Sequence, residues 1–422
     1  MNRVNNKITV KEILIDKYEE FKGKNWWRVP EVLKEEIDTL VKKSLDCGNV
    51  ENGFAEYICQ DCGDVTKVPF TCKSKFCNSC GRLYTLKWAE KQQKNMLRVG
   101  HRHSVFTMPD KLRNYFYRRR ELLKELQDGV YDVIKYWYEK DKKIKYEVGV
   151  IAVIHTFGSD LKWNPHVHAL ITEGAVNKDI NWWKSVEYIP YEFLRKSWQK
   201  ILLDIIKKHF NCYQTRQLIS AMYKKYPNGF YVNAKRKLKD TREAVKYIGR
   251  YLARAAIAEY RIEEYDGEQV TFWYKDHDDG HKVKATMCVI EFIGKITQHI
   301  SLKGFKSVRR YGLYSRRRNK ISQQIVHLYN FVKQGTIRDL LNQKKLNNIK
   351  KSCKERMIET FEINPLKCNK CGTEKILWKV WHKDYGVIYD IKETQNKEDI
   401  LYETVSKKNI HRERVQISLF KL

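Results

Sequence analysis

The chain has 422 residues, of which 42% are hydrophobic and 32% charged. This composition predicts a folded protein of about two or three domains and excludes a disordered or collagen-like chain. Its 82 Lys and Arg residues outnumber 51 Asp and Glu residues, which gives a formal net charge of +31. That charge favours a polyanionic partner, although a generally basic, solvated surface is the alternative. No apolar run approaches the roughly 18 residues of a membrane span, and the N-terminus lacks the apolar core of a secretory signal. We therefore expect a cytoplasmic protein without a membrane partner.

The first half of the chain predicts helices, a cysteine-rich segment and then strands. We expect helices at residues 1–45, 83–100 and 110–143 and a short strand at 103–108. Two β-branched runs, at 146–156 and 166–172, predict strands joined by a loop. These two strands are expected to form an antiparallel pair within a central sheet.

The cysteine-rich segment predicts a structural zinc site. Two Cys-x2-Cys pairs lie 14 residues apart, namely Cys59 with Cys62 and Cys77 with Cys80. Such a spacing is typical of a zinc ion held by four thiolates. Cys47 and Cys72 are left over; they bind a second ion or are buried thiols, and we favour the thiols. A further pair near the C-terminus, Cys368 with Cys371, is weak evidence alone, with Cys353 and His382 as candidate partners.

A His-x-His pair on the second predicted strand is the sharpest indication of chemistry. In a strand, residues i and i+2 face the same way, so His166 and His168 present two imidazoles side by side while Val167 faces the opposite, apolar side. His155 ends the preceding strand and becomes the third ring if the two strands pair. Such a set can hold a metal ion with open positions for water and a phosphate oxygen. A structural histidine pair is the alternative.

Two tyrosines lie one turn apart on a predicted helix within residues 240–260. Tyr247 and Tyr251 share one helix face, beside an apolar stripe, so both hydroxyls can reach the rim of a cleft. Arg250 and Arg254 lie on the same helix, where they bind phosphate or are simply solvated. The alternative for the tyrosines is a packing role. A predicted helix at 190–209 precedes this region, and a predicted hairpin at 270–290 follows it.

A basic segment at residues 301–320 interleaves cations with aromatic rings. Basic side chains can bind phosphates and aromatic rings can stack under bases, so this pattern suits the binding of a single strand of nucleic acid. The usual alternative is a run of solvated charges. Phe305 and Tyr314 belong to this pattern. The candidate DNA-binding residues here are Lys303, Arg309, Arg310, Tyr311, Arg316, Arg317 and Arg318.

Taken together, the motifs resemble those of the rolling-circle transposases of the insertion sequence 91 family, in the HUH endonuclease superfamily. The resemblance spans roughly residues 35–375 and follows the family's order. The landmarks are the cysteine cluster, His155-Thr156-Phe157-Gly158, Pro165-His166-Val167-His168, Tyr247-x3-Tyr251 with Leu252-Ala253-Arg254, Val270-Thr271-Phe272 with Lys275-Asp276, Lys303-Gly304-Phe305, Arg309-Arg310-Tyr311-Gly312, and Asn364-Pro365-Leu366-x-Cys368-x2-Cys371. The chain departs from the family at Lys75-Phe76-Cys77-Asn78, where relatives often have His-Cys-Pro before the last cysteine pair, and at Leu302, which replaces a usual proline.

The resemblance implies a metal-dependent tyrosine DNA endonuclease and strand transferase. It implies that His166 and His168 bind Mg²⁺ or Mn²⁺, that His155 is the third ligand as in related relaxases, and that Tyr247 and Tyr251 are nucleophiles. Its partner would be single-stranded DNA at the element ends and target. A plasmid replication initiator or relaxase with the same chemistry is one alternative, and a non-catalytic zinc-dependent DNA-binding protein is another.

The expected fold is α+β, with a central antiparallel sheet of HUH type and flanking helices. We expect a helical and zinc-binding domain at residues 1–100, a catalytic domain at 101–330 and a C-terminal region with a cysteine knuckle at 331–422.

Overall fold

The computed structural model describes residues 8–139, 145–186, 189–238, 255–276, 280–334 and 366–393, together with Gly249, Glu355 and Asn364. The chain divides into two compact units. The first unit comprises Met1–Leu45 and Lys73–Lys350, and the second comprises Asp46–Cys72 and Lys351–Leu422. This division differs from the predicted boundaries near residues 100 and 330, because the second unit is built from two distant segments of the chain.

An antiparallel sheet of six strands forms the centre of the first unit in the described residues. The strands are β3 (His101–Phe106), β4 (Tyr146–Phe157), β5 (Trp163–Asn177), β6 (Trp182–Ser185), β7 (Val232–Leu238) and β11 (Val308–Gly312). Their order is β11-β4-β5-β3-β7, and β6 pairs with β5. The predicted pairing of the two β-branched runs is confirmed as β4 with β5. The fold is thus mixed α+β with antiparallel sheets, as predicted.

Helices pack on one side of this sheet, and their apolar residues form one core with those of its strands. They are α4 (Asp110–Arg118), α5 (Leu123–Tyr138), α6 (Tyr191–His209) and α7 (Tyr213–Lys225). Trp198 of α6 is fully buried there, beside Phe106 of β3. The predicted single helix at 110–143 is in fact two, separated by a 3-10 turn at Arg120–Leu122. At that turn the buried Arg120 places its guanidinium 3.8 Å over the Trp163 ring.

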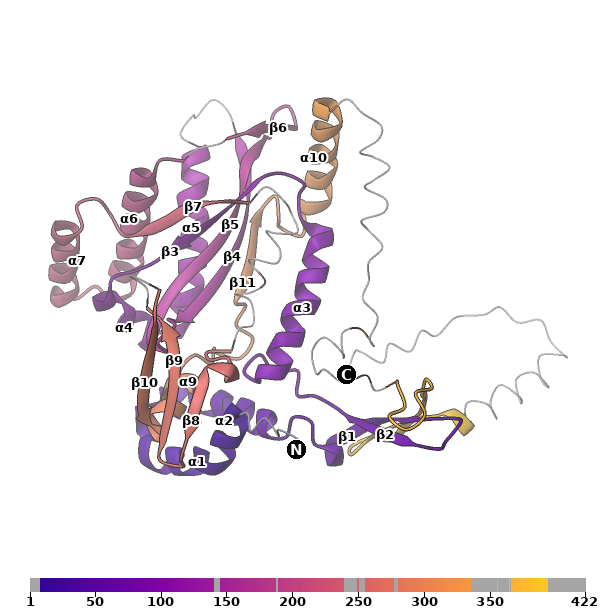
Figure 1. Ribbon diagram of the computed structural model, residues 1–422. Coiled ribbons are helices and arrows are strands. Elements are labelled where there is room, and N and C mark those ends of the chain that lie inside the picture. The colour runs from indigo at the N-terminus through magenta and orange to yellow at the C-terminus, as the bar shows by residue number, and fades with distance from the viewer. Residues whose placement is uncertain are drawn as a thin grey trace. The chain divides into compact units, whose positions relative to one another are not determined.

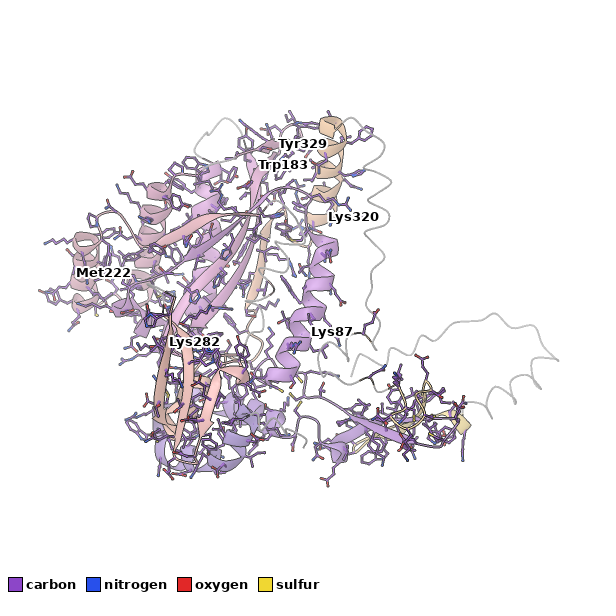
Figure 2. All side chains as sticks on the ribbon, viewed as in Figure 1. Lys87, Trp183, Met222, Lys282, Lys320 and Tyr329 are labelled. Carbon is purple, nitrogen blue, oxygen red and sulfur yellow. The ribbon has the colours of Figure 1, made fainter. Side chains whose placement is uncertain are left out.

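The opposite face carries α3 (Asn78–Asn95) and α10 (Asn319–Gln334). Figure 1 shows these two helices on one side of the sheet and α5 and α6 on the other. Trp88 of α3 is buried in a cluster with Ile151, Val153 and Leu170 of the sheet. At the far end, Trp183 of β6 and Tyr329 of α10 place their rings 6.4 Å apart (Figure 2).

The N-terminal helices belong to a second core of the same unit. There α1 (Val10–Asn25) and α2 (Glu31–Leu45) pack with α9 (Val289–Thr297) and with the sheet formed by β8 (Ile262–Tyr265), β9 (Gln269–Lys275) and β10 (Lys282–Cys288). The α1 helix begins with a capping box between Thr9 and Glu12, which satisfies backbone donors at its first turn. The predicted hairpin at 270–290 is confirmed as β9 with β10.

The second unit contains a small antiparallel sheet in the order β13-β12-β1-β2. Its strands are β1 (Gly53–Ile58), β2 (Val65–Pro69), β12 (Ile376–His382) and β13 (Gly386–Asp390). β1 pairs with β12, so Phe54 lies opposite Trp381 with their ring centroids 5.7 Å apart. Few apolar side chains of its described residues are fully buried, among them Val380. Among the described helices of the whole chain, none is long and apolar enough to cross a membrane.

Candidate metal centre and its surroundings

Three histidines converge on the sheet face that carries α3. The ladder between β4 and β5 places His155 directly opposite His166, and His168 opposite Val153. Since cross-strand partners and residues i and i+2 share a face, all three imidazoles point the same way. One ring nitrogen from each lies within 4.8 Å of the others. The structure therefore brings together the three rings that the sequence singled out, while their role as metal ligands stays a prediction.

The alternation of apolar and polar residues along β5 explains this geometry. Val167 is buried among the side chains of the opposite, helix-covered face. Burying Val167 forces its neighbours His166 and His168 onto the other face, because a shift of one residue would exchange the two sets. On the histidine face, Val153 and Leu170 are buried in a cluster with Trp88 of α3.

Hydrogen bonds orient the individual rings. The Nδ1 atom of His166 lies 2.7 Å from the Asn164 carbonyl oxygen, so it donates a proton there and leaves Nε2 with a lone pair. That Nε2 lies 3.1 Å from Nε2 of His168. Burial lowers the pKa of His168 well below its usual value, helped by the neighbouring His155 and His166. Neutral imidazoles with facing lone pairs are what a metal ion requires of histidine.

The donor set itself indicates which metal ion fits. In the part of the chain that the structure describes, no Asp or Glu joins the three imidazoles. Imidazole nitrogen suits first-row transition metals, whereas Mg²⁺ prefers oxygen ligands. The three histidines therefore fit a divalent transition-metal ion better than Mg²⁺.

A fourth histidine, which sequence reasoning missed, lies behind His168. The Nε2 atom of His103 is 3.0 Å from Nδ1 of His168, and their rings are nearly parallel with centroids 5.3 Å apart. His103 lies on β3, and the pairing of β3 with β5 brings it there. The one indication in the sequence was the position of His103 at the start of the short strand predicted at 103–108, two residues after His101.

The predicted nucleophiles Tyr247 and Tyr251, with Arg250 and Arg254, lie outside the described residues. Gly249 between them is described, and it is helical and buried. A Cβ atom added at Gly249 would lie 3.7 Å from Cβ of Ala89 and 3.9 Å from Cγ2 of Thr85, both on α3. The chain at Gly249 therefore packs on the same helix that covers the histidine face of the sheet.

A disulfide tests the position of Gly249. Because the two Cβ atoms would be 3.7 Å apart, within the range of about 3.5–4.5 Å that a disulfide needs, Gly249→Cys/Ala89→Cys is expected to cross-link under mild oxidation. Peptide mass spectrometry would identify the linked pair. Each single variant is the control for pairing with native thiols. Failure of the double variant to cross-link, with the native fold retained, would contradict this packing.

The basic segment does not place its rings and cations on one surface. Tyr311 donates a hydrogen bond to Asp128 of α5 at 2.8 Å, and its ring stacks on Tyr131, on the face away from the histidines. Burial, followed by the bond to Asp128, raises the pKa of Tyr311. Tyr314 is only 2% exposed and contacts His101 through its hydroxyl. The expectation that Tyr314 stacks on bases is wrong, because the core encloses its ring.

Several cations of this segment remain at the surface. Lys303, Arg310, Arg316 and Arg317 are exposed, whereas Arg309 and Arg318 are half-buried. Arg310 donates to Gln92 of α3 at 3.2 Å, so it lies on the same side of the sheet as the histidines. Arg318 instead pairs with Glu147 at 3.0 Å. The DNA-binding role of these residues stays a prediction.

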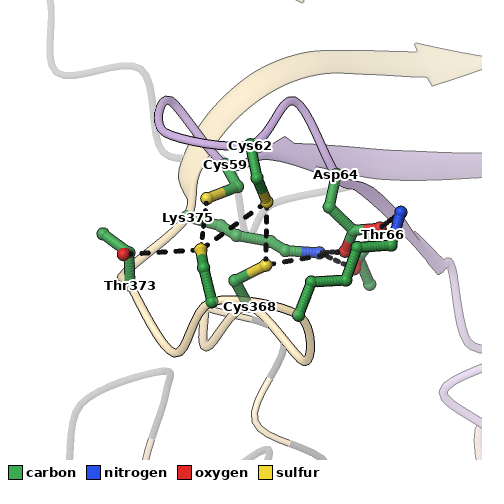
Figure 3. A network of polar contacts seen from close by, with 9 residues as sticks. Cys59, Cys62, Asp64, Thr66, Cys368, Thr373 and Lys375 are labelled. Carbon is green, nitrogen blue, oxygen red and sulfur yellow. Dashed lines mark hydrogen bonds and ion pairs between the residues drawn. The ribbon is translucent and has the colours of Figure 1, made fainter.

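The second unit contains a set of four thiols that corrects the predicted zinc site. Cys59 and Cys62 lie with Cys368 and Cys371, all four sulfur atoms within 4.8 Å of one another. The sulfur atoms of Cys62 and Cys368 are 3.5 Å apart (Figure 3), and those of Cys59 and Cys371 are 3.4 Å apart. The predicted partners Cys77 and Cys80 lie in the first unit, buried at the start of α3. The pairing of β1 with β12 brings the distant knuckle to Cys59 and Cys62, and spacing along the chain could not show this.

Neither candidate partner that the sequence offered for the C-terminal knuckle is needed. His382 instead accepts a hydrogen bond from the Asp384 amide at 3.1 Å. Cys353 lies outside the described residues. Cys47 and Cys72, also left over in the sequence, are near one another in the second unit, where the Cys72 amide donates to the Cys47 thiol at 3.4 Å.

A buried lysine accompanies the four thiols. Lys375, whose side chain is 1% exposed, donates to Asp64 at 2.6 Å and to Thr66 at 2.5 Å (Figure 3). Hydrogen bonds from Lys375 and then Lys370 hold the pKa of Asp64 below its usual value. Hydrogen bonds with Thr373 lower the pKa of Cys371. Lysine charge beside thiolates offsets the net negative charge of a four-thiolate zinc site.

Two family models match separate parts of the chain. Residues 13–108 match the model described as "Transposase zinc-binding domain", and residues 149–321 match the model described as "Putative transposase", a two-tyrosine type. The second match contains the three converging histidines and both predicted tyrosines. Cys368 and Cys371 lie outside both matches.

Two curated relatives support the same assignment. The transposase for insertion sequence element IS801 of Pseudomonas savastanoi pv. phaseolicola is 29% identical over 71% of this chain and 75% of its own. A protein of Sinorhizobium fredii described as "Putative transposase y4qJ" is 24% identical over 61% of this chain and 69% of its own. No solved structure matches the chain significantly.

A zinc-binding segment followed by a sheet that presents three histidines is, with these matches, the organisation of a transposase. Over residues 13–108 and 149–321, the chain matches the two-tyrosine transposases of the insertion sequence 91 family.

Proposed function

We propose that the protein nicks and rejoins single-stranded DNA through a 5′-phosphotyrosine and thereby mobilises an insertion sequence by rolling-circle transposition. The observation that carries this proposal is the convergence of His155, His166 and His168 on one face of a sheet within the transposase match. The central antiparallel sheet is then of HUH-endonuclease type. The DNA at the element ends and at the target is the partner, and the bacterial cytoplasm is the place of action.

In the proposed mechanism the three imidazoles hold a divalent ion, with Mn²⁺ the better fit. A bound ion would polarise the scissile phosphate and offset its negative charge. A phenol has a pKa near 10, so Tyr247 or Tyr251 needs such help to attack. The tyrosine oxygen forms a bond to phosphorus as the bond from phosphorus to the 3′ oxygen breaks, which leaves a free 3′-hydroxyl once that oxygen takes a proton.

The second tyrosine allows a second cut before the first is sealed. Attack by a 3′-hydroxyl on a phosphotyrosine then rejoins the strand and releases the tyrosine, so the joining step needs no nucleotide cofactor. The packing of Gly249 on α3 supports this assignment, since Gly249 lies between the two tyrosines in the sequence. Arg250, Arg254 and the exposed Arg310, Arg316 and Arg317 are proposed to bind phosphates of the DNA.

Zinc has a structural role in this proposal. It is held by Cys59, Cys62, Cys368 and Cys371, which all belong to the second unit. Four thiolates around zinc leave no open position for a substrate, so this ion takes no part in the chemistry.

Covalent attachment of DNA tests the proposed function. The full chain with Mn²⁺ and single-stranded oligonucleotides from the flanks of its own gene should give a protein–DNA adduct on a denaturing gel. Tyr247→Phe or Tyr251→Phe should lower the adduct by about 10³-fold at the end that each tyrosine cuts, because a nucleophile is lost. The matched control is Tyr260→Phe, which alters an exposed tyrosine nearby in the sequence. Wild-type adduct levels in the Tyr247→Phe/Tyr251→Phe double variant would rule out both tyrosines.

A further inference from the structure

His103 is placed to govern how His168 presents its ring to the candidate metal site. Its Nε2 atom lies 3.0 Å from Nδ1 of His168, the nitrogen on the far side of the ring from His166. His103 is 5% exposed, and its backbone is fixed between two strands because β3 pairs with both β5 and β7. The contact between His103 and His168 is therefore buried within the sheet.

The direction of this hydrogen bond follows from the chemistry of a neutral imidazole, which carries one N–H and one lone pair. If His168 is to offer the Nε2 lone pair toward His166 and His155, its proton must be on Nδ1. The group facing Nδ1 must then be an acceptor, and Nε2 of His103 is that group. A donor facing Nδ1 would instead leave the proton of His168 on Nε2. His168 could then no longer bind a metal ion through Nε2.

His166 receives its orientation in a different way. Its Nδ1 donates to the carbonyl oxygen of Asn164, two residues away on the same strand. That backbone acceptor is local, so no other part of the chain is needed for it. For His168, the group that faces Nδ1 is a side chain on another strand, 65 positions away in the sequence.

We propose that His103 is a positioning residue that holds His168 in the Nδ1–H tautomer and so sets the metal affinity of the three-histidine site. This inference rests on the proposed metal-binding function of His155, His166 and His168. It also means that the part of the chain that matches the zinc-binding family contributes a residue to the proposed metal site. His103 lies within residues 13–108, which match a zinc-binding family, yet its strand belongs to the central sheet.

The same strand supplies a matched control. His101 shares the face of β3 with His103 and is fully buried. Its Nε2 lies 2.5 Å from the Tyr314 hydroxyl, and Tyr314 in turn accepts from the Leu97 amide. Removing His101 therefore disturbs a buried imidazole of the same strand without touching His168.

The experiment measures Mn²⁺ binding by isothermal titration and by the electron paramagnetic resonance signal of free Mn²⁺, with the full zinc-containing chain and no DNA. His103→Ala is expected to weaken Mn²⁺ binding by about 10–100-fold, the usual effect of losing the partner of a metal-bound histidine. His103→Gln should restore most of the affinity, since its amide oxygen can accept the same proton. His101→Ala should bind Mn²⁺ like the wild type even if it lowers the melting temperature.

The possible results separate the two proposals. A wild-type chain that binds no Mn²⁺ would reject the proposed metal site, and the role of His103 with it. Wild-type binding together with equal affinity in a folded His103→Ala variant would reject His103 alone. Equal losses of Mn²⁺ affinity in His103→Ala, His103→Gln and His101→Ala would show that any change on β3 disturbs the site. This result would also overturn the inference.

Discussion

The His166→Ala/His168→Ala variant is expected to lose metal-dependent DNA cleavage by about 10³-fold or more, because a metal ion that stabilises charge on phosphate contributes several kcal/mol to such a reaction. His155 alone cannot hold the ion once its partner on the paired strand and His168 are gone. The loss should appear in single-turnover adduct formation at saturating DNA.

A thermal measurement separates this loss from unfolding. The proposed Mn²⁺ site exists only in the folded chain, so Mn²⁺ should raise the melting temperature of the wild type as its concentration exceeds the dissociation constant. The double variant should show a normal far-ultraviolet circular dichroism spectrum but no such rise. His209→Ala is the control, because His209 pairs with Glu125 on the other face of the sheet. Cleavage by the double variant at the wild-type rate would reject the metal site.

The Cys368→Ser/Cys371→Ser variant is expected to release one zinc ion and to unfold the second unit. Structural zinc in small domains contributes about 10 kcal/mol or more of apparent binding free energy. The small sheet cannot offset that loss, because few of its described apolar side chains are fully buried.

Zinc content by atomic emission and limited proteolysis together test this expectation. The variant should contain one zinc ion fewer per chain, and residues of the second unit should be cleaved while the first unit stays resistant. Cys212→Ser/Cys288→Ser, which alters two exposed cysteines of the first unit, should keep all zinc. Unchanged zinc content in the Cys368→Ser/Cys371→Ser variant would instead favour the original sequence-based set of Cys59, Cys62, Cys77 and Cys80.

The histidine site was predictable because its geometry is mainly local. The period of two along a strand places His166 and His168 on one face whatever the rest of the fold does. The site also needs the pairing of β4 with β5. These strands are separated by a five-residue turn, and strands with so short a connection usually pair as antiparallel neighbours. His155 could therefore be placed opposite His166 from the sequence with little more than hairpin geometry.

The zinc partners were not predictable in the same way. A Cys-x2-Cys pair defines half of a site, but nothing in the spacing states which other half completes it. The preference for the nearer pair, Cys77 with Cys80, follows from the smaller entropy of closing a short loop. Pairing of β1 with β12 outweighs that preference, because once the strands are aligned Cys368 and Cys371 are already beside Cys59 and Cys62.

The basic segment shows a similar limit. Interleaved cations and rings predict a DNA-binding surface only if they share one face. Because Tyr311 lies on β11, where faces alternate, its ring packs on α5 while Arg310 reaches the other side. Tyr314 follows the strand and turns into the core against His101.

By itself the sequence determined the family, the α+β class with its antiparallel β4–β5 pair, and the face shared by His166 and His168. These depend on residue order and on periodicities of two and 3.6, which neighbouring residues are sufficient to set. Only the tertiary structure decided that Cys59 and Cys62 join Cys368 and Cys371, that His103 supports His168, and that Tyr314 is buried. Each of these depends on which distant segments lie side by side, and strand order in a sheet is a property of the whole core.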